Sequence, residues 1–137
     1  MIRTPAGTMT RTLHEAHLKR IVIIEDNAMA ANIYQATLAR QGFNVTVATD
    51  GELGLAAVIG SSPDIILLDL MLPKIDGVEL LRRIRATENL ANVPIIVVSN
   101  AFTPARLDSL REAGATRIVS KANMSPKQLL SIVQEFA

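Results

Sequence analysis

Short runs of consecutive apolar residues alternate along the chain with longer segments of helical periodicity. Three of these runs have no polar interruption: Ile21–Ile24, Ile65–Leu68 and Ile95–Val98. Strands that are apolar throughout are typical of a parallel sheet covered by helices on both faces, because a strand with one solvent face alternates apolar and polar residues. Parallel strands need crossover connections, and the helical segments supply them. The pattern predicts an open, doubly wound α/β sandwich.

Two further strands and five helices complete the pattern. A strand is expected over 43–48, where alternate residues are apolar, and a last one over 117–119. The helices are expected at 28–41, at about 52–59, near 77–87, at 104–113 and from 126 to 136. Pro104 and Pro126 stand where proline is favoured, in the first turn of a helix. Five strand–helix units follow one another, and nothing remains for a second domain.

The first 18 residues lack this organisation. Pro5 and Gly7 interrupt any early helix. We interpret residues 1–18 as a tail with a short helix near Leu13–Leu18, and residues 19–137 as the folded domain. His14 and His17 have a spacing that suits a metal ion, but no third ligand lies nearby in the sequence, so we interpret them as exposed tail residues.

Composition excludes several classes of protein. The chain has no cysteine, which rules out disulfides, thiolate catalysis and cysteine-based metal sites. Of its formal net charge of +1, residues 1–20 contribute an excess of basic side chains, so the rest is slightly acidic and does not suggest a nucleic-acid partner. No apolar run approaches the roughly 20 residues that cross a bilayer, and no secretory signal opens the chain. We expect a cytoplasmic protein without a membrane partner.

Polar side chains of defined chemistry follow four of the five strands. Glu25 and Asp26 follow the first strand, Asp69 the third, Ser99 the fourth and Lys121 the last. Ligands of open α/β sheets bind beyond the carboxyl ends of the strands. Because parallel strands place these ends on one edge, we expect the five side chains to converge.

The chemistry of this set points to a metal ion and a phosphate. Three carboxylates suit Mg²⁺, lysine supplies a positive charge for phosphate oxygens, and serine supplies a hydroxyl. Each residue alone has a simpler interpretation: the acids would be helix caps or solvated loop residues, Ser99 a turn residue, and Lys121 a surface lysine. Their joint occurrence, each at the end of a strand, favours a functional site.

Over residues 20–136 the sequence resembles the receiver domains of bacterial two-component response regulators. The most specific stretch runs from Asp64 to Gly77 (DIILLDLMLPKIDG) and is similar to the phosphorylation loop of that family. The resemblance implies a flavodoxin-like (βα)5 fold with a parallel sheet of strand order 2-1-3-4-5. It also implies that a sensor histidine kinase or a histidine phosphotransfer protein phosphorylates a central aspartate.

The same resemblance assigns roles to individual residues. Asp69 would be the phosphoacceptor, and Ser99 and Lys121 would contact the phosphoryl group. The Mg²⁺ ligands would be Glu25, Asp26, Asp69 and the backbone carbonyl of Met71. The protein would not be an enzyme beyond self-catalysed phosphorylation and dephosphorylation of Asp69.

Three positions depart from the family pattern. Ile118 replaces an aromatic residue on the last strand, so the usual rotation of that aromatic is not available. Asn100 replaces a small residue beside the hydroxyl, where it would restrict access of water or small phosphodonors. Ala122 replaces a proline that follows a cis peptide bond, so this peptide would be trans or its loop strained.

Two-component signal transduction by a single-domain regulator is therefore the leading interpretation. Because the sequence ends at Ala137, just after the last helix, we expect output through contact with a downstream protein rather than through an attached effector domain. A receiver-like interaction module regulated without phosphorylation is the main alternative, and the three departures favour it.

Other interpretations are less well supported. An aspartyl phosphatase would need an acid at position 71, which is Met, and a nucleotide-binding protein would need a glycine-rich loop after the first strand. The chain would be a monomer or a weak homodimer. For the dimer, charged residues of the last two helices would pair across a two-fold axis: Arg106, Asp108, Arg111, Glu112 and Lys127. Ordinary solvation of these charges is the simpler interpretation.

Overall fold

A five-stranded parallel sheet forms the centre of the molecule. The computed structural model describes residues 18–70, 76–100 and 103–137. The strands are β1 (Arg20–Ile24), β2 (Asn44–Ala48), β3 (Ile65–Asp69), β4 (Ile95–Ser99) and β5 (Arg117–Ser120). They lie in the order β2-β1-β3-β4-β5, and all neighbours are parallel. This arrangement confirms the expected fold class and strand order.

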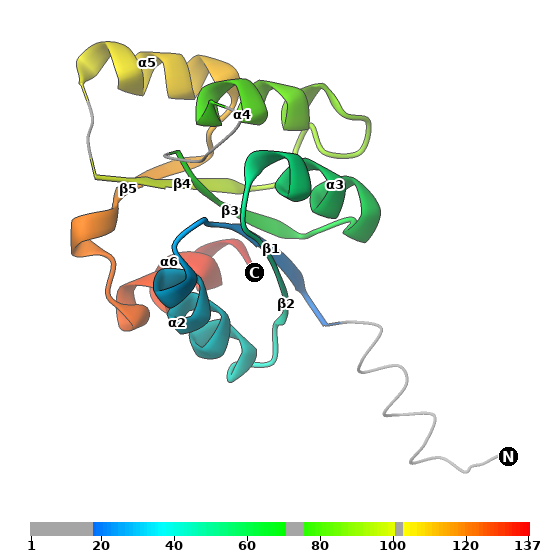
Figure 1. The fold of residues 1–137 in the computed structure, drawn as a ribbon, viewed down its shortest axis with the longest axis vertical. Coiled ribbons are helices and arrows are strands. Elements are labelled where there is room, and N and C mark those ends of the chain that lie inside the picture. The colour runs from blue at the N-terminus through cyan, green and yellow to red at the C-terminus, as the bar shows by residue number, and fades with distance from the viewer. Residues whose placement is uncertain (1–17, 71–75, 101–102) are drawn as a thin grey trace, which may run out of the picture.

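Helices cover both faces of the sheet. They are α2 (Ala28–Ala39), α3 (Gly51–Ser61), α4 (Gly77–Ala86), α5 (Pro104–Ala113) and α6 (Pro126–Phe136), with a short 3-10 helix, η1 (Lys121–Asn123), after β5. One face carries α3, α4 and α5, and the other carries α2 and α6 (Figure 1). Among the described residues no helix is long and apolar enough to cross a membrane.

Each central strand buries side chains on both faces. In β1, Val22 and Ile24 pack into the core beneath α3 and α4, whereas Ile21 and Ile23 pack into the core beneath α2 and α6. All four side chains are buried. The uninterrupted apolar runs of the sequence therefore reflect two cores separated by one layer of backbone.

Side-chain caps fix the starts of the helices. Asn27 accepts a hydrogen bond from the Ala30 N–H, and Thr103 caps α5 immediately before its proline. Ser125 and Gln128 form a reciprocal capping box at the start of α6. These caps confirm the expected helix starts at 28, 104 and 126.

Some helix boundaries differ from those expected. The helix expected over 28–41 ends at Ala39, because the chain turns through Gly42 with a φ of 91°. The helix expected over about 52–59 extends over Gly51–Ser61, since Asp50 rather than Gly51 is its N-cap. The short helix expected near Leu13–Leu18 falls, apart from Leu18, outside the described residues. The division into a tail and a domain remains a prediction.

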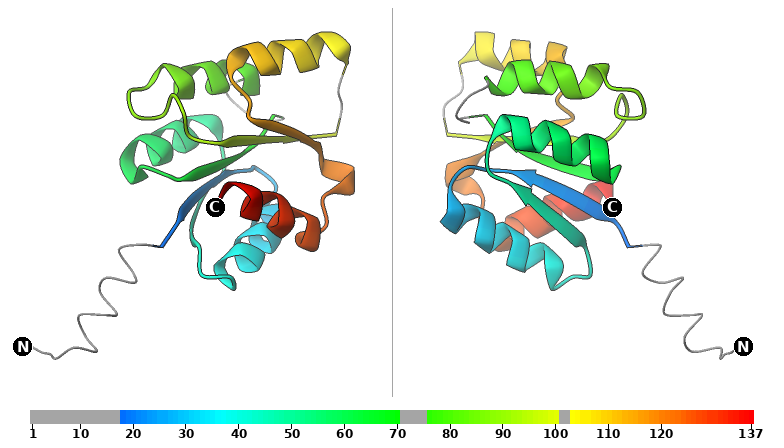
Figure 2. Two further views of the ribbon diagram at one scale, coloured as in Figure 1. Left: turned by 180° about the vertical axis from the view of Figure 1, so that it is seen from behind. Right: turned by 45° about the vertical axis from the view of Figure 1, so that its right-hand side comes forward.

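Arg85 links two connecting segments by hydrogen bonds at the amino edge of the sheet. Arg85 of α4 donates hydrogen bonds to the carbonyl oxygens of Leu90 at 2.9 Å, Val93 at 2.6 Å and Gly114 at 2.8 and 2.9 Å. These carbonyls lie in the α4–β4 connection and in the turn that ends α5. All neighbouring strands are parallel, so their carboxyl ends lie together at the opposite edge of the sheet (Figure 2).

Candidate functional site

The carboxyl edge of the sheet brings together residues far apart in the sequence. Glu25 directly follows β1, Asp69 is the last residue of β3, and Lys121 is the first residue after β5. Parallel pairing in register aligns these strand ends, because β3 pairs with both β1 and β4, and β4 pairs with β5. The neighbouring end of β4 is Ser99.

Lys121 bridges two of the buried carboxylates of this edge, Glu25 and Asp69. Its Nζ lies 2.6 Å from Oε1 of Glu25 and 3.3 Å from Oδ2 of Asp69. The side chains of Glu25 and Asp69 are only 2% and 4% exposed, and that of Lys121 is 22% exposed. A lysine that forms ion pairs with two buried acids offsets the cost of burying their negative charge.

A third carboxylate completes an acidic cluster. Carboxylate oxygens of Glu25, Asp26 and Asp69 lie within 4.8 Å of one another. Asp26 is exposed, so the cluster opens to solvent on its side. Oxygen-only ligands of this kind fit a hard divalent cation such as Mg²⁺, which keeps several of its waters. Met71, whose carbonyl the sequence resemblance adds to this set, lies outside the described residues.

Burial and mutual repulsion disfavour the ionised form of the carboxylates in this site. Burial, followed by the hydrogen bond with Asp69, raises the pKa of Glu25 from 4.5 to about 7 despite the opposing contact with Lys121. Burial alone would lower the pKa of Lys121, but its hydrogen bond to Glu25 and the charge of Asp69 outweigh burial and raise this pKa. The site therefore holds more negative charge than one lysine neutralises, which favours a cation.

Glu25 also contributes to the start of α2. Its Oε2 accepts a hydrogen bond from the backbone N–H of Asn27 at 3.1 Å, while Asn27 caps the helix. The helix-cap interpretation of the acids is thus correct only in part, because the cap of α2 is Asn27 and Glu25 accepts its backbone N–H. It does not exclude the role of Glu25 in the acidic cluster, because the two carboxylate oxygens of Glu25 make different contacts.

The remaining predicted residues surround this centre. Ser99 is buried and pairs in register with Ser120 of β5, and Asn100 beside it is exposed. Ile118 is half-buried and packs against the core beneath α3, α4 and α5. The peptide bond before Ala122 is trans, as are all peptide bonds of the described residues.

Sequence reasoning missed two residues close to the site. Asp50 follows β2, is buried, and caps α3 by accepting the Leu53 N–H at 2.8 Å. With Asp50, all five strands end in polar groups on one edge. Tyr34 of α2 is buried, and burial raises the pKa of its hydroxyl, which also feels the charges of Lys121, Glu25 and Asp69. The Asp-Gly pair after the second strand was a signal for Asp50; the helical spacing of Tyr34 indicated only a core position.

Some of the charged residues considered for a dimer contact form ion pairs within the chain. Arg106 of α5 lies 3.5 Å from Oδ1 of Asp76, the N-cap of α4, and Arg111 lies 3.7 Å from Asp108. These ion pairs and ordinary solvation account for the charged side chains without a second copy of the chain. A homodimer through these charges stays a prediction.

Comparison with known proteins places the chain in a family. The model of the response regulator receiver domain matches residues 21–134. The chain belongs to the receiver-domain family of response regulators. Among curated relatives, it is 42% identical over 106 residues to the transcriptional regulatory protein CseB of Streptomyces coelicolor, covering 74% of this chain and 42% of CseB. It is 33% identical over 116 residues to the DNA-binding response regulator MtrA of Mycobacterium tuberculosis, covering 85% of this chain and 49% of MtrA.

Solved receiver structures share the fold. The chemotaxis protein CheY4 of Vibrio cholerae superposes with a TM-score of 0.82 at 23% identity, covering 88% of this chain and 99% of CheY4. The receiver domain of the sensor histidine kinase PA1611 of Pseudomonas aeruginosa has a TM-score of 0.78 at 29% identity, covering 87% of this chain and 97% of that domain. That structure has a magnesium ion coordinated in its active site cleft. The chain spans about a third to a half of the length of the curated relatives it matches.

Proposed function

We propose that this receiver domain signals through Mg²⁺-dependent phosphorylation of Asp69. The observation that carries the proposal is the bridge made by Lys121 between Glu25 and Asp69 inside the acidic cluster. A carboxylate nucleophile meets an anionic phosphodonor in this reaction, so positive charge has to be present before the two approach. Lys121 supplies one such charge, and Glu25, Asp26 and Asp69 would hold the cation that supplies the rest.

The residues of the site divide the work of phosphoryl transfer. A carboxylate oxygen of Asp69 attacks the phosphorus atom of a phosphohistidine, so that a P–O bond forms as the P–N bond breaks. The histidine leaves with the electron pair of that bond and takes a proton from solvent. Lys121, already 3.3 Å from Asp69, is placed to pair with an oxygen of the transferred group. The bound cation would neutralise charge on the phosphoryl oxygens and orient them.

Ser99 is the residue through which the new group would act on the fold. It ends β4 next to Asp69, and its partner in register, Ser120, directly precedes Lys121. A hydroxyl and a lysine that both turn to the same phosphoryl group would alter the end of β5 and the start of η1. Such differential contacts shift a two-state equilibrium toward one conformation.

The departures from the family pattern modify this signal without removing the acceptor. Ile118 is held in the core beneath α5, so a rotating aromatic takes no part in it. Asn100 stands exposed beside Ser99, where its amide would slow attack by water and by small phosphodonors. We expect a long-lived phosphoryl group as a consequence.

The partners follow from the same chemistry. The donor would be a sensor histidine kinase or a histidine phosphotransfer protein, and the output would be contact with a downstream protein. We place this protein, and the phosphotransfer to it, in the cytoplasm.

Phosphorylation can be tested with a small donor that carries a P–N bond. Phosphoramidate at high concentration with Mg²⁺ is expected to add one phosphoryl group, detected by intact-protein mass spectrometry and removed by hydroxylamine, which cleaves acyl phosphates. Asp69→Asn should abolish the gain, and Asp108→Asn, an exposed aspartate of α5, should retain it. A gain of mass that persists in Asp69→Asn would show that another residue is the acceptor.

A further inference from the structure

β2 forms an edge of the sheet that is open to pairing. Among the described residues, its only neighbour in the sheet is β1. The N–H of Asn44 donates to the carbonyl of Lys19, just before β1. Because backbone groups alternate in direction along a strand, those of Val45 and Val47 point away from β1. The strand (NVTVA) has neither a charged residue nor a proline, the features that commonly keep an edge strand from pairing.

The side of α3 that faces this edge is uncharged and has open space. A helix turns about 100° per residue, so Leu53, Ala57 and Gly60 share one side of α3. Gly60 lines a hollow of about 310 Å³ together with Asn44 and Thr46, which identifies this side as the one toward β2. Leu53 is 55% exposed. A Cβ added at Gly60 would meet no atom within 4 Å. An exposed apolar side chain and an open position therefore lie on the same side of the helix.

The side of α2 that faces the same edge is uncharged as well. Ile33 and Thr37 face α6, because they line a hollow with its Pro126. Helical spacing places four uncharged residues on the opposite side of α2, toward the edge of β2: Ala28, Asn32, Gln35 and Ala39. Both alanines are exposed. The two helices that flank β2 thus leave room for a close neighbour.

We propose that two copies of this chain pair through β2, antiparallel about a two-fold axis at Thr46, so that their sheets join into one sheet of ten strands. Val45 of one copy then exchanges backbone hydrogen bonds with Val47 of the other. α3 lies over β1, where Gly54 approaches Ile24, and beside β2. With strands about 4.8 Å apart, the two α3 helices would lie about 10 Å apart, an ordinary distance between packed helices.

The flanking helices are self-complementary in this arrangement. In an antiparallel pair centred on the middle of each helix, a residue before the centre of one helix meets one equally far after the centre of the other. Leu53 of one copy then lies opposite Gly60 of the other and enters the hollow beside it. On α2, Asn32 lies opposite Gln35 of the other copy, and the two side-chain amides can hydrogen-bond. These matches are between parts of one chain, which favours a second copy over a foreign strand.

Charge favours the antiparallel direction. Lys19 and Arg20 lie at the amino end of β1 and are exposed. Asp26 follows its carboxyl end, Glu52 lies in the first turn of α3, and both are exposed. The antiparallel pair places the basic end of each copy beside the acidic end of the other, whereas a parallel pair would bring like charges together.

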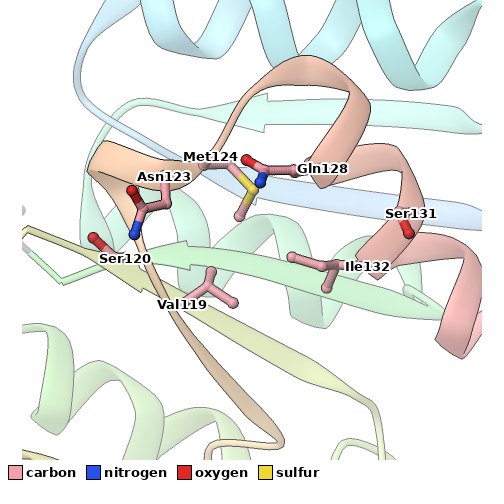
Figure 3. A pocket seen from close by; sticks show the side chains of 7 residues that line it. All are labelled: Val119, Ser120, Asn123, Met124, Gln128, Ser131 and Ile132. Atoms are coloured by element: carbon pink, nitrogen blue, oxygen red, sulfur yellow. The ribbon is translucent and has the colours of Figure 1, made fainter.

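The other edge strand, β5, is less suited to a second copy. A hollow of about 360 Å³ lies between β5 and α6, and Val119, Met124 and Ile132 are among the residues that line it (Figure 3). Arg117 of β5 is held by Glu135 at 2.8 Å, and Val119 is part of the hollow itself. On this side of β5, neither residue is available to fill the hollow of a partner copy, as Leu53 does at β2.

Self-association of the full chain is the first test. Sedimentation velocity between about 10 µM and 1 mM should show a monomer–dimer equilibrium with a Kd on the order of 100 µM or tighter. Hydrogen exchange followed by NMR should be at least 2-fold slower at 1 mM than at 50 µM for the amides of Val45 and Val47, which are outward in the monomer and paired in the dimer.

A cysteine at the axis tests the register. The chain has no cysteine, so Thr46→Cys adds a single thiol that faces its own copy. Opposed residues without mutual hydrogen bonds in an antiparallel pair have Cα atoms about 4.5 Å apart, a separation that a disulfide can span. Mild oxidation should convert most of this variant to a covalent dimer. Thr49→Cys, also at an exposed threonine, is the matched control: its two copies would lie about 20 Å apart and should stay largely uncrosslinked.

Two pairs of variants test the strand and the helix separately. Val45→Pro removes an outward N–H without removing a bond to β1 and should raise the Kd at least 10-fold. Val119→Pro makes the same change on β5 and should leave the Kd unchanged. Ala39→Arg places a long charged side chain on the side of α2 toward β2 and should also raise the Kd at least 10-fold. Its control is Ala36→Arg, at an exposed alanine of α2 that lines the hollow with Pro126. Urea unfolding verifies that each variant folds.

Several results would overturn the proposal. They are a chain that stays monomeric up to 1 mM, a dimer that Val45→Pro leaves intact or Val119→Pro disrupts, and a Thr46→Cys variant that crosslinks no more than Thr49→Cys. Slow exchange at Val45 and Val47 that does not depend on concentration would show that another segment covers β2, and would overturn it too. Phosphorylation of Asp69 is a separate question, because no residue that pairs or packs in this dimer belongs to the candidate site.

Discussion

The buried carboxyl of Glu25 should make the metal-free protein less stable as the pH rises from 5 to 8. Its pKa is raised from 4.5 to about 7 in the folded protein, first by burial and then by the hydrogen bond with Asp69. The folded state therefore holds this proton more tightly than the unfolded chain does. The stability that the proton contributes is complete below pH 4.5 and is lost as the pH rises through about 7.

The size of the effect follows from the same two values. One pKa unit corresponds to about 1.4 kcal/mol, so the interval from 4.5 to about 7 gives an upper figure of about 3 kcal/mol. Glu25→Gln keeps the shape of the side chain and cannot ionise. The variant should be within about 1 kcal/mol of the wild type at pH 5 and more stable by about 3 kcal/mol at pH 8.

Urea unfolding in a chelating buffer at pH 5, 6, 7 and 8 measures this difference. Subtracting the variant from the wild type removes the contribution of other titrating groups, and the raised pKa of Lys121 lies above this range. Glu52→Gln, which changes an exposed carboxylate of α3, should keep the wild-type slope. A wild type that gains stability relative to Glu25→Gln with rising pH would refute the reasoning, because Lys121 would then hold Glu25 ionised in the folded state.

Three further substitutions test other parts of the account. Arg85→Met leaves several carbonyls without their donor and should lower the free energy of unfolding by about 2–4 kcal/mol in urea denaturation. An unchanged free energy of unfolding would contradict a stabilising role for the Arg85 hydrogen bonds. Gly54→Ala would place a Cβ 2.7 Å from the side chain of Ile24, so we expect the free energy of unfolding to fall by about 1–3 kcal/mol in the same assay. An increase, which alanine gives at an uncrowded helix position, would contradict this close approach. Asn100→Ala should shorten the lifetime of phosphorylated Asp69 roughly 5-fold, or about 1 kcal/mol, in a dephosphorylation time course, and an unchanged lifetime would show that the amide does not restrict water.

Hydrophobic pattern was sufficient to predict the fold class, because a doubly covered parallel sheet imposes its signature on every central strand; the strand order came from the family resemblance. β1, β3 and β4 are apolar throughout since each separates two cores. The edge strand β2 shows the alternation that partial exposure allows. Proline and capping residues fixed the helix starts, whereas α2 ends earlier than its periodicity suggests because the turn at Gly42, not the apolar spacing, sets its end.

The convergence of Glu25, Asp69 and Lys121 was also predictable, since parallel strands carry their carboxyl ends to one edge. The pairing among them was not. Lys121 lies closer to Glu25 than to Asp69, a choice made by side-chain packing that no spacing in the sequence encodes. The burial of Asp50 and Tyr34 likewise depends on neighbours from other elements.

Binding of beryllofluoride tests the central claim most directly. Melting temperatures of the wild type and of Asp69→Asn would be compared with and without Mg²⁺ plus beryllofluoride. A ligand that binds only the folded state adds about 2.7 kcal/mol at one hundred times its Kd, which corresponds to a rise on the order of 10 °C for a domain of this size. We predict an Mg²⁺-dependent rise in the wild type that disappears in Asp69→Asn. An absence of any rise at saturating ligand would contradict a phosphoacceptor at Asp69 and favour an interaction module regulated without phosphorylation.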